Sequence, residues 1–174
     1  MYLKARTEGD GLVSMAALMV SGVNMEGYRE ILGVKIGDSE SAGFWTDVFR
    51  WLKERGLEDV AFIVSDDHSG LTSAARRCFQ GAILQRCQVH FMRNVLSHTP
   101  ARHKAEIAEG LKRIFAAETA AEAHQKFAEL AQQMEAKAKK AIECLEAGLE
   151  DALAVLDLPK NTTNACAQAT CKSA

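Results

Sequence analysis

The sequence contains no apolar run that approaches the ~20 residues of a membrane-spanning helix. Its first residues, MYLKARTEGDG, lack the apolar stretch of a secretory signal peptide. The five cysteines are odd in number and irregular in spacing, unlike the disulfide framework of a small secreted domain. We therefore expect free thiols and a cytoplasmic chain. A length of 174 residues suits one domain, on a prior of roughly 100 to 200 residues per domain.

Acidic residues are absent from one long stretch. No Asp or Glu occurs between His68 and Ala105, whereas six basic residues do: Arg76, Arg77, Arg86, Arg93, Arg102 and Lys104. The whole chain has a formal net charge of −2, so it is not basic throughout. The stretch indicates either a surface that binds a polyanion or a basic face that pairs with the acidic segment from Glu106 onward.

The apolar pattern predicts an α/β order of elements. Two partly alternating runs at 12–23 and 29–36 flank the turn-like segment Asn24–Gly27 and predict a hairpin, preceded by a strand at 1–6. The elements expected next are a helix capped within Asp38–Ser41 and ending near Gly56, a strand at 60–64, a helix at 71–79, a brief strand at 82–84 and a helix that carries His90. The continuous apolar run at 60–64 favours a central strand covered by helices on both faces.

After Pro100 the composition changes to Ala, Glu, Lys and Gln, and two helices are expected, at 105–116 and 120–156. Thr119 and Glu122 have the spacing of a capping box. We interpret the apolar stripe that follows as a packing surface and not as a cofactor site; its members are Phe127, Leu130, Met134, Ala138, Ile142, Leu145 and Leu149. The tail after Pro159 has no apolar periodicity and is predicted to be disordered.

Two aspartates follow the strand expected at 60–64. Asp66 can project from the strand end, where open α/β sheets hold ligands and metals, and Asp67 should point elsewhere. Alternatively, one of the two caps the helix that begins near Gly70. Spacing alone leaves both interpretations open.

Cys87 and His90 form a Cys-x-x-His pair. The pair could donate to zinc, but a structural site needs four ligands and no second pair at finger-like spacing is present. A half-buried thiol beside a packed histidine is the simpler interpretation. A cysteine nucleophile activated by histidine is a further one, although no oxyanion loop or orienting group is evident.

Four segments together resemble the mutator-type transposases of bacterial insertion sequences: SDDHSGL, QRCQVHFMRN, FWTDVFRWLKERGL and REILGVKIGDSESAGFW. The resemblance runs from Met1 to about Pro159. It implies an incomplete ribonuclease H-like core, a mixed sheet with helices, at 1–100. It also implies an all-helical insertion at 101–158, followed by the tail at 159–174, and DNA as the partner.

The resemblance further implies an Asp-Asp-Glu triad that binds two Mg²⁺ ions, because three carboxylates can hold two hard cations at a phosphodiester. Asp66 matches the second aspartate of the triad, and Asp67 falls on a variable position. Cys87 and His90 match the family's Cys-x-x-His signature. The arginines expected to contact DNA are Arg76, Arg77, Arg86 and Arg93.

The sequence departs from the family pattern at both ends. The first aspartate of the triad would fall upstream of Met1, and no Glu follows Asp151 to supply the third carboxylate. Lys160–Thr170 can be back-translated with freely chosen codons. Read in a neighbouring frame, these codons encode an amino-acid sequence close to the one that the family has at this position. We therefore expect a frame change near codon 160, which the nucleotide sequence of the locus tests.

Three functional hypotheses follow. The chain is a transposase fragment that is inactive alone and holds Mg²⁺ weakly, a truncated regulator that binds DNA or full-length transposase copies, or an inert product of a decayed gene. DNA binding that weakens steeply with salt would distinguish the second hypothesis from the third.

Overall fold

The computed structural model describes residues 2–6, 12–37 and 41–157. Within these ranges the chain divides into two units by its internal contacts. The first unit contains the residues up to 63 together with 68–83, and the second contains 64–67 together with the residues from 84 onward. This division groups residues by contact, and the predicted domain boundary near residue 100 stays a prediction.

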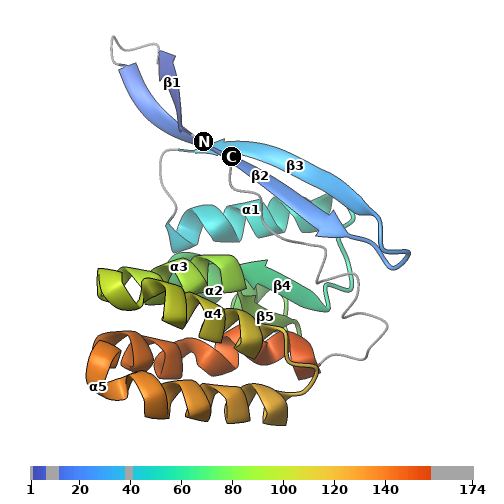
Figure 1. The fold of residues 1–174 in the computed structure, drawn as a ribbon. Coiled ribbons are helices and arrows are strands. Elements are labelled where there is room, and N and C mark those ends of the chain that lie inside the picture. Colours follow the sequence, from blue (N-terminus) through green and yellow to red (C-terminus); the bar gives the residue numbers. More distant parts are fainter. Residues whose placement is uncertain (1, 7–11, 38–40, 158–174) are drawn as a thin grey trace. The chain divides into compact units, whose positions relative to one another are not determined.

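The first unit begins with three antiparallel strands in the order β1-β2-β3 (Figure 1). They are β1 Tyr2–Arg6, β2 Leu12–Val23 and β3 Arg29–Gly37. The turn between β2 and β3 is built on Asn24, whose Oδ1 accepts the backbone N–H groups of Glu26 at 3.1 Å and Tyr28 at 3.0 Å. An Asn side chain that satisfies its own turn in this way favours chain reversal. The predicted hairpin is confirmed.

One face of the β2–β3 hairpin is covered by helix α1, Ala42–Glu54. Gly33 and Gly37 allow the helix to approach, because a Cβ at these positions would overlap the rings of Trp51 and Phe44 respectively. The alternate positions carry large apolar side chains that are more than half exposed: Met19, Ile31, Val34 and Ile36. Since Met19 pairs with Val34, these side chains share the face that α1 leaves open.

Helix α1 also packs against α2, Ser69–Cys78. Ser41 caps α1, because its Oγ accepts the N–H of Phe44 at 3.2 Å, as expected from the sequence. The Phe49 and Phe79 rings meet edge to face with centroids 5.2 Å apart. The apolar core of this helix pair comprises Trp45, Val48, Phe49, Leu52, Leu71, Ala74 and Ala75.

Strands β4, Phe62–Ser65, and β5, Ile83–Arg86, form a separate two-stranded sheet. Backbone hydrogen bonds run from Ile83 N to Ala61 O and from Cys87 N to Ser65 O. The sequence separation between donor and acceptor is the same in both, so the two strands run parallel. The prediction of a covered central strand is wrong. Among the described strands β5 is the one partner of β4, and Val64 is 39% exposed. An apolar run indicates a strand, but it does not encode the number of neighbours that the strand acquires.

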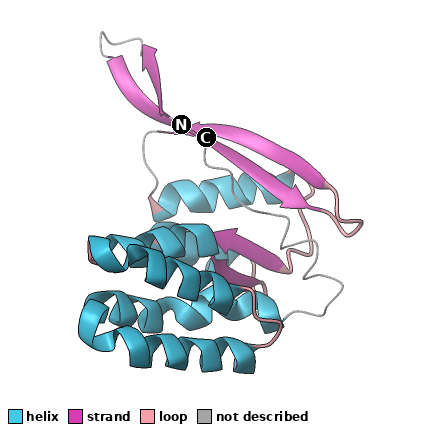
Figure 2. Cartoon of the chain, viewed as in Figure 1, coloured by secondary structure: helices cyan, strands magenta, loops and turns pink. Residues whose placement is uncertain are grey.

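The second unit is largely helical (Figures 1 and 2). Its elements are α3 Gln88–Ser97, a 3₁₀ turn at Ala101–His103, α4 Lys104–Phe115, α5 Ala120–Leu153 and a 3₁₀ turn at Ala154–Asp157. The predicted helices at 105–116 and around His90 are confirmed to within a few residues.

The prediction of one helix over 120–156 is wrong, because α5 turns back at Ala138. This residue has non-helical torsions of φ −145° and ψ 46°, and the two halves of α5 lie side by side in Figure 1. His124 of the first half contacts Glu150 of the second at 3.2 Å, which fixes the halves as antiparallel. The apolar stripe continues through the turn, since both halves face one core. Periodicity therefore hides the reversal, and no Gly or Pro marks it.

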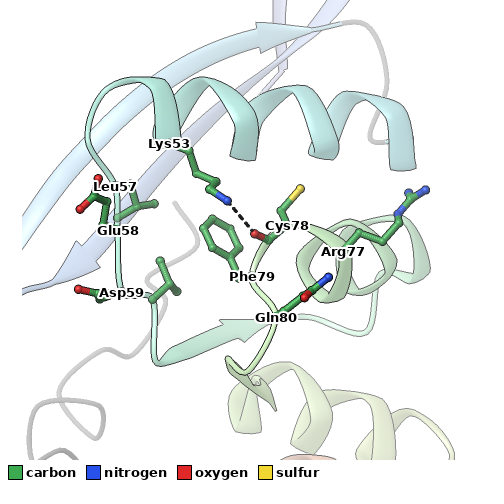
Figure 3. Close-up of a pocket in the computed structure, with 9 residues that line it drawn as sticks. Lys53, Leu57, Glu58, Asp59, Arg77, Cys78, Phe79 and Gln80 are labelled. Atoms are coloured by element: carbon green, nitrogen blue, oxygen red, sulfur yellow. Dashed lines mark hydrogen bonds between the residues drawn. The ribbon is translucent and has the colours of Figure 1, made fainter.

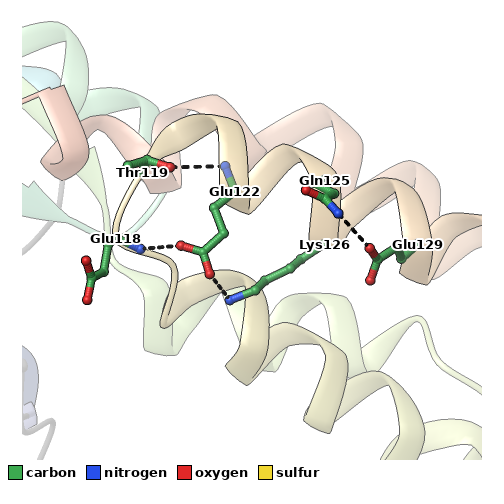
Figure 4. A network of polar contacts seen from close by, with 6 residues as sticks. All are labelled: Glu118, Thr119, Glu122, Gln125, Lys126 and Glu129. Atoms are coloured by element: carbon green, nitrogen blue, oxygen red, sulfur yellow. Dashed lines mark hydrogen bonds and ion pairs between the residues drawn. The ribbon is translucent and has the colours of Figure 1, made fainter.

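The predicted capping box at the start of α5 is present in part (Figure 4): Thr119 makes its side-chain bond, but the Glu122 carboxylate binds the residue before the N-cap and not Thr119 itself. Thr119 Oγ1 accepts the N–H of Glu122 at 3.2 Å, and the Glu122 carboxylate accepts the N–H of Glu118 at 3.0 Å. The pKa of the Glu122 carboxyl is lowered, chiefly by its hydrogen bond with the Lys126 side chain and next by its hydrogen bond with the backbone N–H of Glu118. The contribution of this carboxylate to stability is therefore present above its usual pKa and is lost as the pH falls through the lowered value.

The second unit has one continuous apolar core formed by α3, α4 and both halves of α5. The predicted stripe lies in it: Leu130, Met134, Ala138, Ile142, Leu145 and Leu149 are buried and Phe127 is partly buried against them. The interpretation of the stripe as a packing surface is confirmed. No helix in the described ranges is long and apolar enough to span a bilayer. Cys78, Cys87 and Cys144 carry free thiols.

Gly110 offers a test of this core. A Cβ there would lie 2.6 Å from Leu130 Cδ1, and Leu130 is only 2% exposed, so it has little room to move. We expect Gly110→Ala to lower the free energy of unfolding by about 1 kcal/mol, because overpacking outweighs the gain in helix propensity. Gly43→Ala is the matched control, since its Cβ would meet nothing closer than 3.7 Å and should leave stability unchanged or raised. Urea unfolding followed by circular dichroism measures both, and equal effects would contradict the expectation.

Candidate site at the ends of two parallel strands

The candidate site lies where β4 and β5 end, within the second unit. Asp66 and Asp67 follow β4, and Cys87 follows β5. The N–H of Cys87 donates to the carbonyl oxygen of Ser65 at 2.6 Å, so the two strand ends are joined by a backbone hydrogen bond. Because carboxyl ends of parallel strands share one edge of the sheet, the predicted site residues from both strands are brought to one place.

The two aspartates behave differently. Asp67 Oδ2 forms an ion pair with Arg86 Nη2 at 3.0 Å, whereas Asp66 is exposed and makes no ion pair with any residue that the structure describes. Neither caps α2: the N-cap residue is His68, which makes no side-chain capping bond. The capping interpretation is therefore wrong. Asp66 is left as an exposed carboxylate at a strand end.

Arg86 is the most enclosed charged group of the site. Its side chain is 15% exposed, and its guanidinium lies 4.3 Å from the centroid of the Phe91 ring. Stacking on an aromatic face and a carboxylate partner together compensate the loss of water around a guanidinium. Asp67, at 63% exposure, keeps one side in solvent.

Cys87 is buried at 5% exposure and occupies the N-cap position of α3. His90 lies one turn later and is partly buried, and its Nδ1 is enclosed without a hydrogen-bond partner. Among the described residues, no three His, Cys, Asp or Glu side chains gather closely enough to hold a metal ion. A zinc site has no support there. The simpler interpretation expected a half-buried thiol beside a packed histidine; Cys87 is more buried than that, and His90 is only partly buried.

The lack of such a cluster among the described residues also limits the binding of Mg²⁺. A two-metal site needs several carboxylates around the ions, and the described part of this edge offers Asp66 together with Asp67, which is already paired with Arg86. These residues alone do not fit two Mg²⁺ ions.

A buried amide that sequence reasoning missed ties β5 to the end of α5. Gln85 is 5% exposed; its Nε2 donates to the carbonyl oxygen of Ala152, and its Oε1 accepts the N–H of Val155 at 2.7 Å. Gln88 Nε2 donates to the same Ala152 oxygen at 3.0 Å. The available signal was an uncharged polar residue next to the apolar pair Ile83–Leu84 in a short strand. The carbonyl of Ala152 and the N–H of Val155, at the end of α5, thus find hydrogen-bond partners in these amide side chains.

Cys144, on the second half of α5, also faces α3. Asn94 Nδ2 donates to its Sγ at 3.6 Å. Burial raises the pKa of the Cys144 thiol, and the positive charge of Arg86 acts in the opposite direction. The thiol therefore stays protonated near neutral pH, which fits a packing role.

The remaining arginines expected to contact DNA are exposed. Arg76 and Arg77 occupy the last turn of α2 in the first unit, and Arg93 lies on α3 in the second. Whether they contact DNA stays a prediction. Their exposure distinguishes them from the enclosed Arg86.

The first unit contains a separate hollow of about 540 Å³, seen in Figure 3. Lys53 lines it and donates to the carbonyl oxygen of Cys78 at 3.2 Å. Glu58 and Asp59 line it as well as Lys53 and Arg77, so its lining includes residues of both charge signs. None of the strand-end residues lines this hollow.

The model of the family described as "Transposase, Mutator family" matches residues 1–170. The transposase for insertion sequence element IS256 in transposon Tn4001 of Staphylococcus aureus is 40% identical over 115 residues, which is 66% of this chain and 29% of the relative. The transposase for IS406 of Burkholderia multivorans is 31% identical over 159 residues, 91% of this chain and 41% of the relative. The chain therefore spans less than half the length of these relatives.

Proposed function

The chain belongs to the Mutator family of transposases, and from this premise we propose that it is the segment of a DNA transposase that carries one catalytic carboxylate, Asp66. Transposition requires cleavage and joining of phosphodiesters at the ends of the element. The observation that carries the proposal is the exposed Asp66 at the end of β4, next to the parallel strand β5. Strand ends of this kind are where α/β sheets place ligands and metals.

An incomplete ribonuclease H-like core is the fold we propose for the region before α4. Three antiparallel strands, a parallel β4–β5 pair and helices that alternate with the later strands are compatible with it. Under the same proposal α4 and α5 belong to the helical insertion. Cys87 and His90 then shape the floor of the site through packing, since Cys87 is buried where β5 meets α3.

We propose Mg²⁺ as the metal of the complete site, with further carboxylates from outside the described residues. Asp66 would supply one oxygen donor, and hard divalent cations favour such ligands. Because the described carboxylates are too few for two ions, the chain alone is proposed to lack cleavage activity.

DNA is the proposed partner, and the exposed Arg76, Arg77 and Arg93 are the proposed phosphate contacts among the predicted arginines. No acidic residue lies between His68 and Ala105 to offset them in sequence. The second candidate function, a regulator that binds DNA or full-length copies without cleaving, rests on these same exposed arginines, because binding to phosphates needs no carboxylate triad.

The purified 174-residue chain should not nick supercoiled plasmid DNA in Mg²⁺ or Mn²⁺. A chain extended upstream of Met1 and continued from codon 160 in the neighbouring frame that restores the family pattern should do so, and Asp66→Asn should reduce that activity about 100-fold or more, since loss of a metal-binding carboxylate forfeits several kcal/mol of transition-state stabilisation. Asp47→Asn is the control, because Asp47 makes only an exposed contact with Arg50 at 3.6 Å. Activity of the extended chain that survives Asp66→Asn would overturn the proposed role of Asp66.

The chain should bind duplex DNA without sequence preference and with a steep dependence on salt. We expect Arg93→Ala to weaken binding and to lower the slope of log K against log [salt] by about 1, the value for one lost phosphate contact. Fluorescence anisotropy between 50 and 200 mM salt would measure this, a range chosen because phosphate binding falls by orders of magnitude across it, about 10³-fold for 6 contacts. Arg50→Ala, also an exposed helical arginine, is the control. Binding that does not respond to salt would exclude this surface as a phosphate contact.

A further inference from the structure

Arg86 is enclosed on three sides by residues of the second unit. Asp67 lies on one side, with 3.0 Å between the charged atoms, and the Phe91 ring lies beneath the guanidinium. The backbone of α5 closes the third side at Gly148, where a Cβ would overlap Arg86 Nη1 and lie 2.8 Å from Phe91 Cε2. Only glycine leaves room for the stacked pair at this point of α5.

This environment does not suit a phosphate contact. With 15% of its side chain exposed, Arg86 offers little surface to DNA, and a phosphate would have to displace Asp67. A guanidinium that is largely removed from water depends strongly on its carboxylate partner, because an unpaired charge at such a position is costly. The contact is therefore suited to hold Asp67 in place.

Asp67 is the residue next to Asp66, so a fixed Asp67 restricts the backbone that presents Asp66. We propose that Arg86 is a positioning residue: it holds the end of β4, and with it Asp66, against the second half of α5. The inference rests on the proposed function, which gives Asp66 its importance. The helical hairpin then determines where the strand-end carboxylate stands, through Gly148, Phe91 and Arg86.

Lysine should not replace Arg86. Its ammonium retains the charge but lacks the planar surface that stacks on Phe91 and the fork that reaches Asp67 at the same time. Gly148→Ala disturbs the same stacked pair from the side of α5, because its Cβ would overlap Arg86, and it changes no charge. Both variants should displace the backbone and side-chain carboxyl resonances of Asp66 and Asp67.

The test is NMR spectroscopy of the 174-residue chain with selectively labelled aspartate. Arg86→Lys and Gly148→Ala should each shift the Asp66 and Asp67 resonances, whereas Gly110→Ala should leave them in place although it also strains the helical core. In an Arg86→Ala background, Gly148→Ala should cause no further shift at Asp67. Unchanged Asp66 and Asp67 resonances in Gly148→Ala, or equal shifts in Gly110→Ala, would overturn the proposal.

DNA binding separates this role from a phosphate contact. Arg86→Lys preserves the charge and Arg86→Ala removes it, yet both should leave the salt slope of DNA binding unchanged, in contrast to Arg93→Ala. A slope lowered by about 1 in Arg86→Ala would identify a phosphate contact and overturn the proposal. Failure of Asp66→Asn to reduce the activity of the extended chain would instead overturn the proposed function and leave the Arg86–Asp67 result standing.

Discussion

The second unit depends on one constraint: both halves of α5 must bury their apolar sides in the same core. Leu130 and Met134 of the first half and Leu145 and Leu149 of the second lie in this core. Burial of large aliphatic side chains supplies most of the favourable free energy of such a bundle, at about 25 cal/mol per Å² of apolar area. The reversal at Ala138 is what allows it. The position of α3, and hence of the strand end that precedes it, follows from this packing.

Polar contacts then connect the bundle to the strand ends. Gln85 binds the carbonyl of Ala152 and the N–H of Val155, and Arg86 lies between Asp67 and the Phe91 ring. Both residues come from β5 and both are largely buried, so their polar atoms require fixed partners. Consecutive residues on a strand point to opposite faces, and here each face carries a side chain that joins the strand to neighbouring structure.

Local signals predicted much of this arrangement. Asn24 and Gly27 marked the hairpin, Ser41 marked the start of α1, and Thr119 with Glu122 marked the start of α5, because turns and caps depend on side chains a few residues apart. Strand β4 was predicted from its short continuous apolar run. Three features were not predicted, since each depends on residues distant in sequence: the reversal at Ala138, the single partner strand of β4, and the close approach of Arg86 to Gly148.

The candidate site residues show the same limit. Sequence alone grouped Arg86 with the other arginines by charge, and only the packing around it separates an enclosed guanidinium from exposed ones. Asp66 was proposed from its place after a strand and from the family resemblance, and its role stays a prediction. Its environment, with Asp67 engaged by Arg86 and Cys87 buried beside it, depends on which side chains the second unit brings together.

The open face of the β2–β3 hairpin has a consequence for the behaviour of the chain in a cell. Four large apolar side chains there, Met19, Ile31, Val34 and Ile36, are 53% to 66% exposed. Contiguous apolar surface on a strand pair is attractive to other extended chains and promotes association between copies. Exposed apolar surface of this kind is what chaperones and proteases act on, so a segment or a second copy that covers this face would also protect the strand pair from them.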